Sequence, residues 1–325
     1  MKKKVLPIFI FCIAAAFTFA ACGESCAAAQ LTFGAKMPWD MPRLYEKCVY
    51  SVEEYTMMEI NGLSTRDKQL SSGTLEFTLE EAENGNASLD MRTEITYFDI
   101  EENGSDRGLT DVYTSNVVFD KLTLAPRSSA KSAAIAKRSD RDDKSFSLTV
   151  DYGANTETLT FAGGEPQTRT IDLKGQYFDN EQLFFLMRAF PNLMTSGSQS
   201  FTLHVPLDAF SYSHPAYGMI MSVGKDAQAV RLEKWKGESD YSMEKAEDGT
   251  LAPQCYSVSV SINGANSGTP ILATYAVNPF VITPNISTTK VMTSMTTSAY
   301  GTNGNSGART TYYTLIDYVA LAPNA

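Results

Sequence analysis

One segment, residues 177–190, has the pattern of an amphipathic helix, whereas most of the remaining sequence has the pattern of β-strands. It contains Tyr-Phe-Asp-Asn-Glu-Gln-Leu-Phe-Phe-Leu-Met-Arg-Ala-Phe. Asp179 can cap the first turn, and Gln182 can reach back to it from three residues later, which is the arrangement of a capping box. Pro191 prevents the helix from continuing. The sequence therefore predicts a helix over 178–190 that the surrounding strands bury.

The predicted helix has one broad apolar face. At about 100° per residue, five large apolar side chains fall on the same side. These are Leu183, Phe184, Leu186, Met187 and Phe190. Burying each of them contributes roughly 1.5–3 kcal/mol, which is enough to hold the helix in a core without any ligand. The same face could instead border a crevice for a hydrophobic ligand, and the sequence leaves both possibilities open.

Residues 43–325 are expected to form a single β-rich domain. Runs of β-branched and aromatic residues, separated by turns that contain Gly, Asn and Pro, lie on both sides of the predicted helix. The simplest fold class is mainly β (α+β), with a large antiparallel curved sheet, a half-barrel, wrapped around one central helix. Residues 125–144 interrupt the pattern with Ser, Ala, Lys, Arg and Asp, and we expect an exposed insertion there, either solvated or used for docking.

The first 21 residues have the pattern of an export signal. Lys2, Lys3 and Lys4 precede an apolar run from Val5 to Phe19, which is too short to span a membrane comfortably. No nucleic-acid partner is expected, because the formal net charge of the whole chain is −10 and phosphate binding needs a basic surface.

The end of the export signal, Phe19-Ala20-Ala21-Cys22-Gly23, resembles the lipobox of bacterial lipoproteins. The resemblance implies cleavage before Cys22 and attachment of a diacylglyceryl group to its sulfur. Residues 22–42 would then be a tether, and the domain would lie outside the cytoplasm in the cell envelope, anchored to a membrane by its N-terminal lipid. Ordinary secretion, with cleavage after Ala27-Ala28-Ala29, is the alternative.

Two cysteines of the β-rich domain, Cys48 and Cys255, are candidates for a disulfide. Export to an oxidising compartment permits the bond, but the sequence cannot fix the pairing. The alternative is two thiols, since no Cys-x-x-Cys pattern or histidine partner indicates metal or redox chemistry.

Signatures of catalysis are missing from the sequence. His204 and His214 lack the spacing of a two-histidine metal site, and there is no Gly-x-Ser-x-Gly elbow, dinucleotide fingerprint or phosphate loop. Adjacent acids such as Glu53 and Glu54 point to opposite faces of a strand. We therefore expect no catalytic residue, no metal and no cofactor, although folding can still bring distant carboxylates together into a hydrolase site.

Three stretches resemble a known group of proteins. They are Tyr177 to Pro191, Phe201-Thr-Leu-His-Val-Pro, and Pro253-Gln-Cys-Tyr-Ser-Val-Ser-Val. The pattern over 44–322 is similar to uncharacterised bacterial envelope proteins whose antiparallel sheet curls half way round a helix, like the LolA and LolB lipoprotein carriers. The resemblance implies a half-barrel whose concave face can receive acyl chains.

Two non-enzymatic functions follow from these observations. The first is a lipid-anchored envelope protein that binds a hydrophobic molecule or a lipidated partner in its concave face. The alternative is a structural or docking lipoprotein with a filled core, which recognises another envelope protein through exposed edge strands and residues 125–144. An open cavity beside the helix would favour the first function, and a packed interior would favour the second.

Overall fold

The computed structural model describes sixteen stretches of the chain, which together carry the β-rich domain. They are residues 45–61, 63–98, 108–121, 123–136, 144–173, 175, 177–184, 186, 197–207, 216–225, 230–235, 241–245, 255–262, 271–277, 290–299 and 309–321. The predicted export signal, the lipidation site Cys22 and the tether lie outside these residues. Within them, no helix is both long and apolar enough to cross a bilayer.

Fifteen strands form one large sheet, and two more form a separate hairpin. The strands are β1 (Tyr45–Ile60), β2 (Leu63–Glu81), β3 (Asn86–Tyr97), β4 (Thr110–Asp120), β5 (Pro126–Ala134), β6 (Phe146–Asp151), β7 (Thr156–Phe161), β8 (Gln167–Thr170), β9 (Tyr177–Asp179), β10 (Gly197–His204), β11 (Ala216–Lys225), β12 (Val230–Trp235), β13 (Tyr241–Lys245), β14 (Cys255–Ile262), β15 (Ile271–Val277), β16 (Lys290–Ala299) and β17 (Arg309–Leu321). The order in the large sheet is β8-β7-β6-β5-β4-β3-β2-β1-β17-β16-β15-β14-β11-β10-β9, while β12 and β13 pair only with each other. All pairs are antiparallel except β9 with β10. The prediction of a mainly β fold with a large antiparallel sheet is confirmed.

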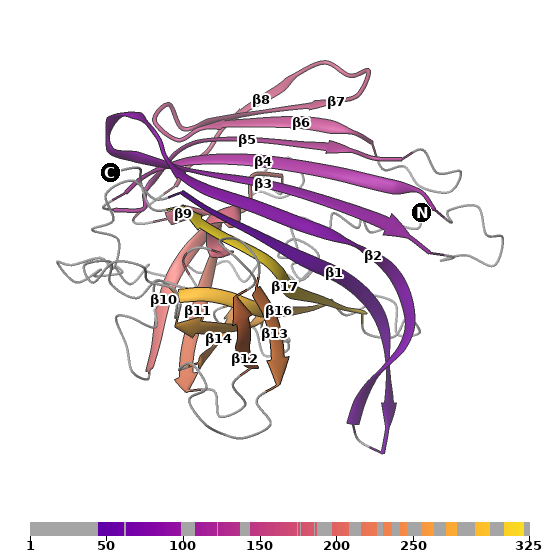
Figure 1. Cartoon of the computed structure of the whole chain (residues 1–325). Coiled ribbons are helices and arrows are strands. Elements are labelled where there is room, and N and C mark those ends of the chain that lie inside the picture. Colours follow the sequence, from indigo (N-terminus) through magenta and orange to yellow (C-terminus); the bar gives the residue numbers. More distant parts are fainter. Residues whose placement is uncertain are drawn as a thin grey trace.

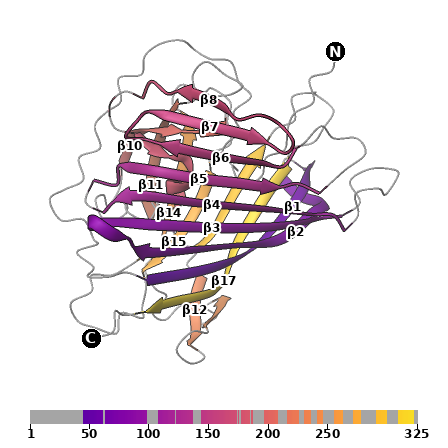
Figure 2. The same cartoon turned by 90° about the horizontal axis from the view of Figure 1, so that it is seen from above.

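The sheet curls over on itself to make two layers. In Figure 1 the strands β2–β8 form the upper layer, and β9, β10, β11, β14, β16 and β17 lie beneath them. Seen from above, the strands of the two layers run in clearly different directions (Figure 2), as in orthogonally packed sheets. The sheet does not close, because β8 and β9 are its two edge strands and do not pair with each other.

Alternation along each strand builds the interior between the layers. In β4, every second residue from Asp111 to Phe119 is buried, while its neighbours are exposed or half-buried. The turn at Asn84-Gly85 joins β2 to β3, and both of its residues have positive φ, a conformation that asparagine and glycine tolerate best. Large side chains from the inward faces, such as Tyr50, Phe77 and Tyr113, are almost fully buried.

The predicted central helix is reduced to a turn in the part of the chain that the structure describes. Tyr177–Asp179 is the strand β9, and a 3-10 helix, η3 (Asn180–Gln182), follows it. Leu183, Phe184 and Leu186 then have helical backbone, whereas Phe185 and residues 187–190 lie outside the described residues. The predicted capping box between Asp179 and Gln182 is present.

The prediction of a helix that begins at 178 was therefore wrong, because the backbone of β9 pairs with β10 instead. Tyr177 lies opposite Thr202 in that ladder, and Asp179 lies opposite His204. The helical pattern of the sequence is real only from the cap onwards. Among the described residues, the interior is filled by the two layers and this turn, and not by a long helix.

The prediction of an exposed insertion over 125–144 was also wrong for residues 126–134, which form a strand inside the sheet. Pro126–Ala134 is β5, which lies between β4 and β6 and has Ser129, Lys131 and Ala133 buried. Two of these inward residues are small, which leaves room for β9 to approach β5. Residues 137–143 lie outside the described residues.

Candidate functional site

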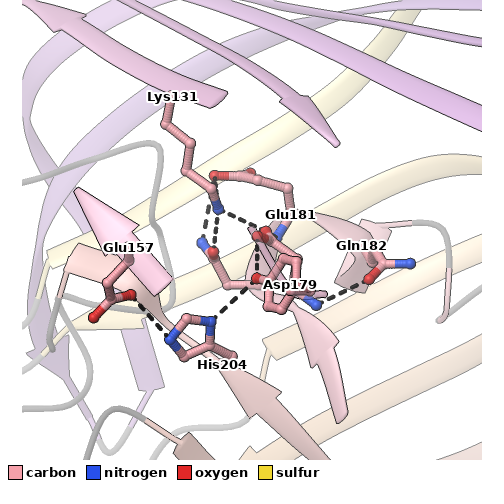
Figure 3. A network of polar contacts seen from close by, with 8 residues as sticks. Lys131, Glu157, Asp179, Glu181, Gln182 and His204 are labelled. Atoms are coloured by element: carbon pink, nitrogen blue, oxygen red, sulfur yellow. Dashed lines mark hydrogen bonds and ion pairs between the residues drawn. The ribbon is translucent and has the colours of Figure 1, made fainter. Parts of the chain in front are cut away.

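Eight polar side chains meet in the interior, between β5 and the β6–β7 turn on one side and β9, η3 and β10 on the other (Figure 3). Each is at most 4% exposed. β5 contributes Lys131, the residues around the β6–β7 turn contribute Tyr152 and Glu157, and β9, η3 and β10 contribute the other five. We call this set the polar network: Lys131, Tyr152, Glu157, Asp179, Asn180, Glu181, Gln182 and His204.

Lys131 is the positive centre of the polar network. Its Nζ donates to Asp179 Oδ1 at 2.6 Å and to Asn180 Oδ1, and it lies 3.7 Å from Glu181 Oε1. An ammonium has three N–H groups, so three oxygens match what it can donate. The lysine therefore joins β5 of the upper layer to the turn that follows the edge strand β9.

Asp179 is the most heavily bonded acid of the polar network. Its Oδ1 also accepts from the backbone N–H of Glu181 at 3.0 Å, and its Oδ2 accepts from the hydroxyl of Tyr152 at 2.7 Å. Burial by itself raises the pKa of Asp179, but the charge of Lys131 and the hydrogen bonds from Lys131, Tyr152 and Glu181 together hold that pKa below its ordinary value. Asp179 is therefore a carboxylate.

Gln182 fixes the turn to its surroundings on the other side. Its Oε1 accepts from the backbone N–H of Asp179 at 2.9 Å, and its Nε2 donates to the backbone oxygen of Leu124 at 2.8 Å. One side chain thus completes the capping box and ties η3 to the connection between β4 and β5.

Glu181 has fewer partners than Asp179. Besides the 3.7 Å contact with Lys131, its Oε1 accepts from Asn180 Nδ2 at 3.3 Å. Burial raises the pKa of Glu181 to about 7; the charge of Lys131 opposes that rise and the neighbouring charge of Asp179 adds to it. Near neutral pH this carboxyl therefore exists in both its protonated and its ionised form.

His204 connects Tyr152 to Glu157. Because the Tyr152 hydroxyl donates to Asp179, its oxygen must accept from His204 Nδ1, 3.1 Å away, so Nδ1 carries a hydrogen. His204 Nε2 lies 3.3 Å from Glu157 Oε2, which is close enough for an ion pair although the angles do not make a hydrogen bond. Burial, together with the charge of Asp179, raises the pKa of Tyr152 well above its ordinary value, so its hydroxyl keeps its hydrogen.

The chemistry open to the polar network is limited by its burial. Carboxylates, a histidine, a lysine and a tyrosine in contact can pass protons among themselves. A substrate would have to reach them, and each is sealed from solvent. No group of three or more His, Cys, Asp or Glu residues in the described parts of the chain could hold a metal ion.

The apolar residues predicted on the helix face lie on the other side of the same turn. Leu183, Phe184 and Leu186 are buried, while Met187 and Phe190 lie outside the described residues. The ring of Phe184 packs edge-on against Tyr313 at 6.4 Å between centroids. Beside it is a cavity of about 10 Å³, room for one water molecule at most. Its walls are Val52, Leu75, Met91, Thr93, Ile95, Phe184 and Tyr313.

Cys48 is a buried thiol in β1, and its Sγ donates to Glu46 Oε1 at 3.6 Å. Cys255 opens β14, and three strands, β17, β16 and β15, separate β14 from β1 in the sheet. Of the two alternatives that the sequence leaves open, the Cys48–Cys255 disulfide is therefore not formed, since neighbouring strands are about 4.8 Å apart and a disulfide needs Cα atoms within about 7 Å.

A second candidate site is an arm made by the free end of the β1–β2 hairpin. β17 pairs with β1 only as far as Thr56, and β3 pairs with β2 only from Ser71. Residues 57–70 therefore continue as a two-stranded ribbon, which projects from the body of the molecule at the lower right of Figure 1. We call residues 57–70 the arm.

One face of the arm is apolar at its tip. Met58 and Ile60 alternate along β1, and Leu63 lies opposite Ile60, so the three side chains share a face. They are 42%, 48% and 69% exposed. At the base of the arm, the guanidinium of Arg66 lies 4.8 Å from the centroid of the Tyr55 ring and 3.9 Å from that of Tyr312, which holds the arm against β17.

The two edges of the arm differ. The β2 edge carries Arg66, Asp67 and Lys68, and the register of β1 against β2 shifts near these residues. Charges and bulges discourage pairing with another strand. On the β1 edge, no described strand pairs with residues 57–60 on the side that β17 occupies further down. The β1 edge is therefore the better place for a partner strand.

The comparisons with known proteins identify no relative. No family model, no curated protein and no solved structure matches this chain. Function must therefore be inferred from the residues and their geometry.

Proposed function

We propose that this protein is an exported, lipid-anchored envelope protein without enzymatic activity, which docks another envelope protein on its outer surface. The observation that carries the proposal is the close packing of the interior in the part of the chain that the structure describes. Pockets that bind small molecules usually have about 300–1,000 Å³, whereas the cavity beside Phe184 has about 10 Å³. A packed interior favours the docking function over the carrier function.

The arm is the docking element in this proposal, and its occupant is an extended segment of the partner protein. Such a segment can pair with residues 57–60 and so continue the ladder that β17 makes up to Thr56. Its alternate side chains would be apolar, because Met58, Ile60 and Leu63 lie exposed on one face beside that edge. The edge strand β8 is a weaker candidate, since it has four residues, Gln-Thr-Arg-Thr, and all are polar and exposed.

Photocrosslinking in living cells tests the docking function. A photoreactive phenylalanine at Met58 is expected to give one discrete adduct, and the crosslinked peptide of the partner should be an extended, apolar-alternating segment. The same amino acid at Thr168 on β8 is the matched exposed control. The adduct should disappear when Leu63→Lys is added. Adducts that are the same at both positions, or that persist in Leu63→Lys, would contradict docking on the arm.

Anchoring is tested separately, because it rests on the lipobox resemblance. Cells fed an alkyne fatty acid should label the wild-type chain, and Cys22→Ser should lose the label and leave the membrane fraction. Cys26→Ser is the control, since it changes a nearby cysteine and should leave the label in place. An unlabelled wild-type chain would leave ordinary secretion as the explanation of the export signal.

The carrier function remains a second candidate because of one observation. The cavity lies against Phe184, on the helix face that the sequence predicts for a hydrophobic ligand, and the resemblance to LolA-like half-barrels implies an acyl chain there. Mass spectrometry of an organic extract of the natively purified protein would show a stoichiometric lipid if the interior opens to one. An empty extract, together with no binding of a fluorescent fatty acid, would exclude the carrier function.

A further inference from the structure

We propose that the polar network is a pH-sensitive switch: when Glu181 loses its proton, the turn over residues 179–186 loosens from β5 and the apolar interior beside Phe184 opens. The switch is a property of the fold, independent of the docking proposal. If the carrier function holds, the switch also determines when its interior is accessible.

The place of the polar network in the sheet makes it a natural point of opening. β9 is an edge strand of three residues, and its ladder with β10 is its pairing in the sheet. The upper layer holds the turn after β9 through Lys131 of β5, Tyr152 of the β6–β7 turn and the Leu124 backbone oxygen. Weakening these contacts loosens one edge of the sheet without breaking the long ladders of β1, β2 and β3.

The charges around Lys131 balance only if Glu181 is neutral. Lys131 supplies one positive charge, and Asp179 takes its closest contact. Glu181 is then the surplus acid, 3.7 Å from Lys131 and beside the Asp179 carboxylate. A second buried negative charge has no second cation to pair with among these groups, so ionisation disfavours the closed arrangement.

The ionisable groups that face Glu181 in the described structure act on it in opposite directions. Lys131 on β5 attracts its ionised form, whereas Asp179 on β9 and the loss of solvent oppose it. Behind Asp179 lie Tyr152, then His204 of β10 and Glu157 of β7, which are linked to Glu181 only through Asp179. The balance favours a proton on Glu181 up to about neutral pH, where its pKa lies.

Opening of the turn must disturb the apolar interior, because the same turn carries both. Glu181 is two residues from Leu183 and three from Phe184. Phe184 packs on Tyr313 and forms one wall of the cavity. Displacement of Phe184 enlarges that cavity, which lies between Leu75, Met91 and Ile95 of the upper layer and Tyr313 of the lower layer.

Hydrogen exchange of the full chain, followed by mass spectrometry at pH 6 and pH 8, tests the switch. After correction for intrinsic exchange rates, peptides that cover 177–186 should open about tenfold more at pH 8, since a carboxyl with a pKa near 7 in the closed state and near 4.5 in the open state gives that ratio. Peptides from β2 and β3 should not change. Glu181→Gln, which keeps the neutral shape, should remove the difference, and Glu76→Gln, an exposed acid paired with Lys47, should retain it.

Two results would overturn the switch. One is an equal change in hydrogen exchange between pH 6 and pH 8 in the wild-type chain and in Glu181→Gln, which would mean that another group titrates. The other is no pH effect at 177–186 in the wild-type chain, a result that does not depend on whether any variant folds. Both are independent of whether crosslinking at Met58 finds a partner, so the failure of one proposal can be told from the failure of the other.

Discussion

The two sides of one short turn, residues 179–186, are buried by opposite means. On one side, Asp179 and Glu181 lie in the polar network, where every contact depends on the placement of a proton or a charge. On the other side, Phe184 and Leu186 are buried, and a small, mostly apolar cavity lies between Phe184 and the sheet. Both sides are almost completely sealed from water.

The two sides differ in how well they tolerate substitution. Apolar packing is non-directional and its loss scales with the area or volume removed. A buried ion needs a partner of opposite charge to offset its desolvation cost. Removing one partner of the pair leaves the other with that full cost. The charged side should therefore make the structure specific, and the apolar side should supply most of its stability. Four changes test this contrast.

Lys131→Met should have the largest effect. It preserves the length of the side chain but leaves Asp179 without its cation, and we expect a loss of about 3–5 kcal/mol in the free energy of unfolding. Urea denaturation at pH 7 measures it. Lys47→Met is the control: Lys47 is bonded to Glu76 at 2.9 Å but both side chains are about one-third exposed or more, so its loss should stay below about 1 kcal/mol. Equal effects of the two variants would remove the contrast between the buried network and a surface pair.

Phe184→Ala should cost about 3 kcal/mol, because it enlarges an existing cavity in an interior that relaxes only in part. Phe184→Leu, which keeps an apolar side chain of similar size, should cost less than about 1.5 kcal/mol. The same denaturation experiment separates the two. If Phe184→Leu lowered the free energy of unfolding as much as Phe184→Ala does, the apolar side would tolerate a change of side-chain shape no better than the charged side tolerates the loss of a partner.

Raising the pH from 6 to 8 should lower the stability of the wild-type chain relative to Glu181→Gln by about 1.4 kcal/mol. The folded-state pKa of Glu181, about 7, is above its unfolded value of 4.5, so the folded chain binds this proton more tightly. The stabilisation is complete below about pH 4.5 and is lost as the pH rises through 7. Urea curves of both proteins at the two pH values measure the difference, and parallel changes in both would contradict it.

The same contrast explains what could be predicted from the sequence. The β-rich fold, with its turns that contain Gly and Asn, and the Asp179–Gln182 capping box were predicted, because alternation and turn chemistry are local. Burial of Leu183, Phe184 and Leu186 was also predicted from a local pattern. The start of the helix was wrong because pairing of β9 with β10 is a distant interaction that overrides local preference.

The polar network could not be found in this way, since its members are far apart in the chain. Lys131 and Asp179 are separated by 48 positions, and Tyr152 and His204 by 52. One signal was present: Lys131 alternates with Ser129 and Ala133 on the inward side of β5. The Ser- and Ala-rich composition of that strand hid the alternation, because small residues rarely mark a strand when nothing shows what packs against them.

The smallest expected effect on stability lies outside both sides of the turn. Ile60→Ser at the tip of the arm removes an apolar side chain that is 48% exposed and packs against little, so the free energy of unfolding should change by less than about 0.5 kcal/mol. The crosslink from position 58 should nevertheless be lost, because Ile60 and Leu63 form the apolar face beside the open β1 edge. Denaturation and crosslinking of the same variant measure the two quantities. Loss of both together would mean that the tip is part of the folded body, and retention of the crosslink would mean that the partner does not use this face.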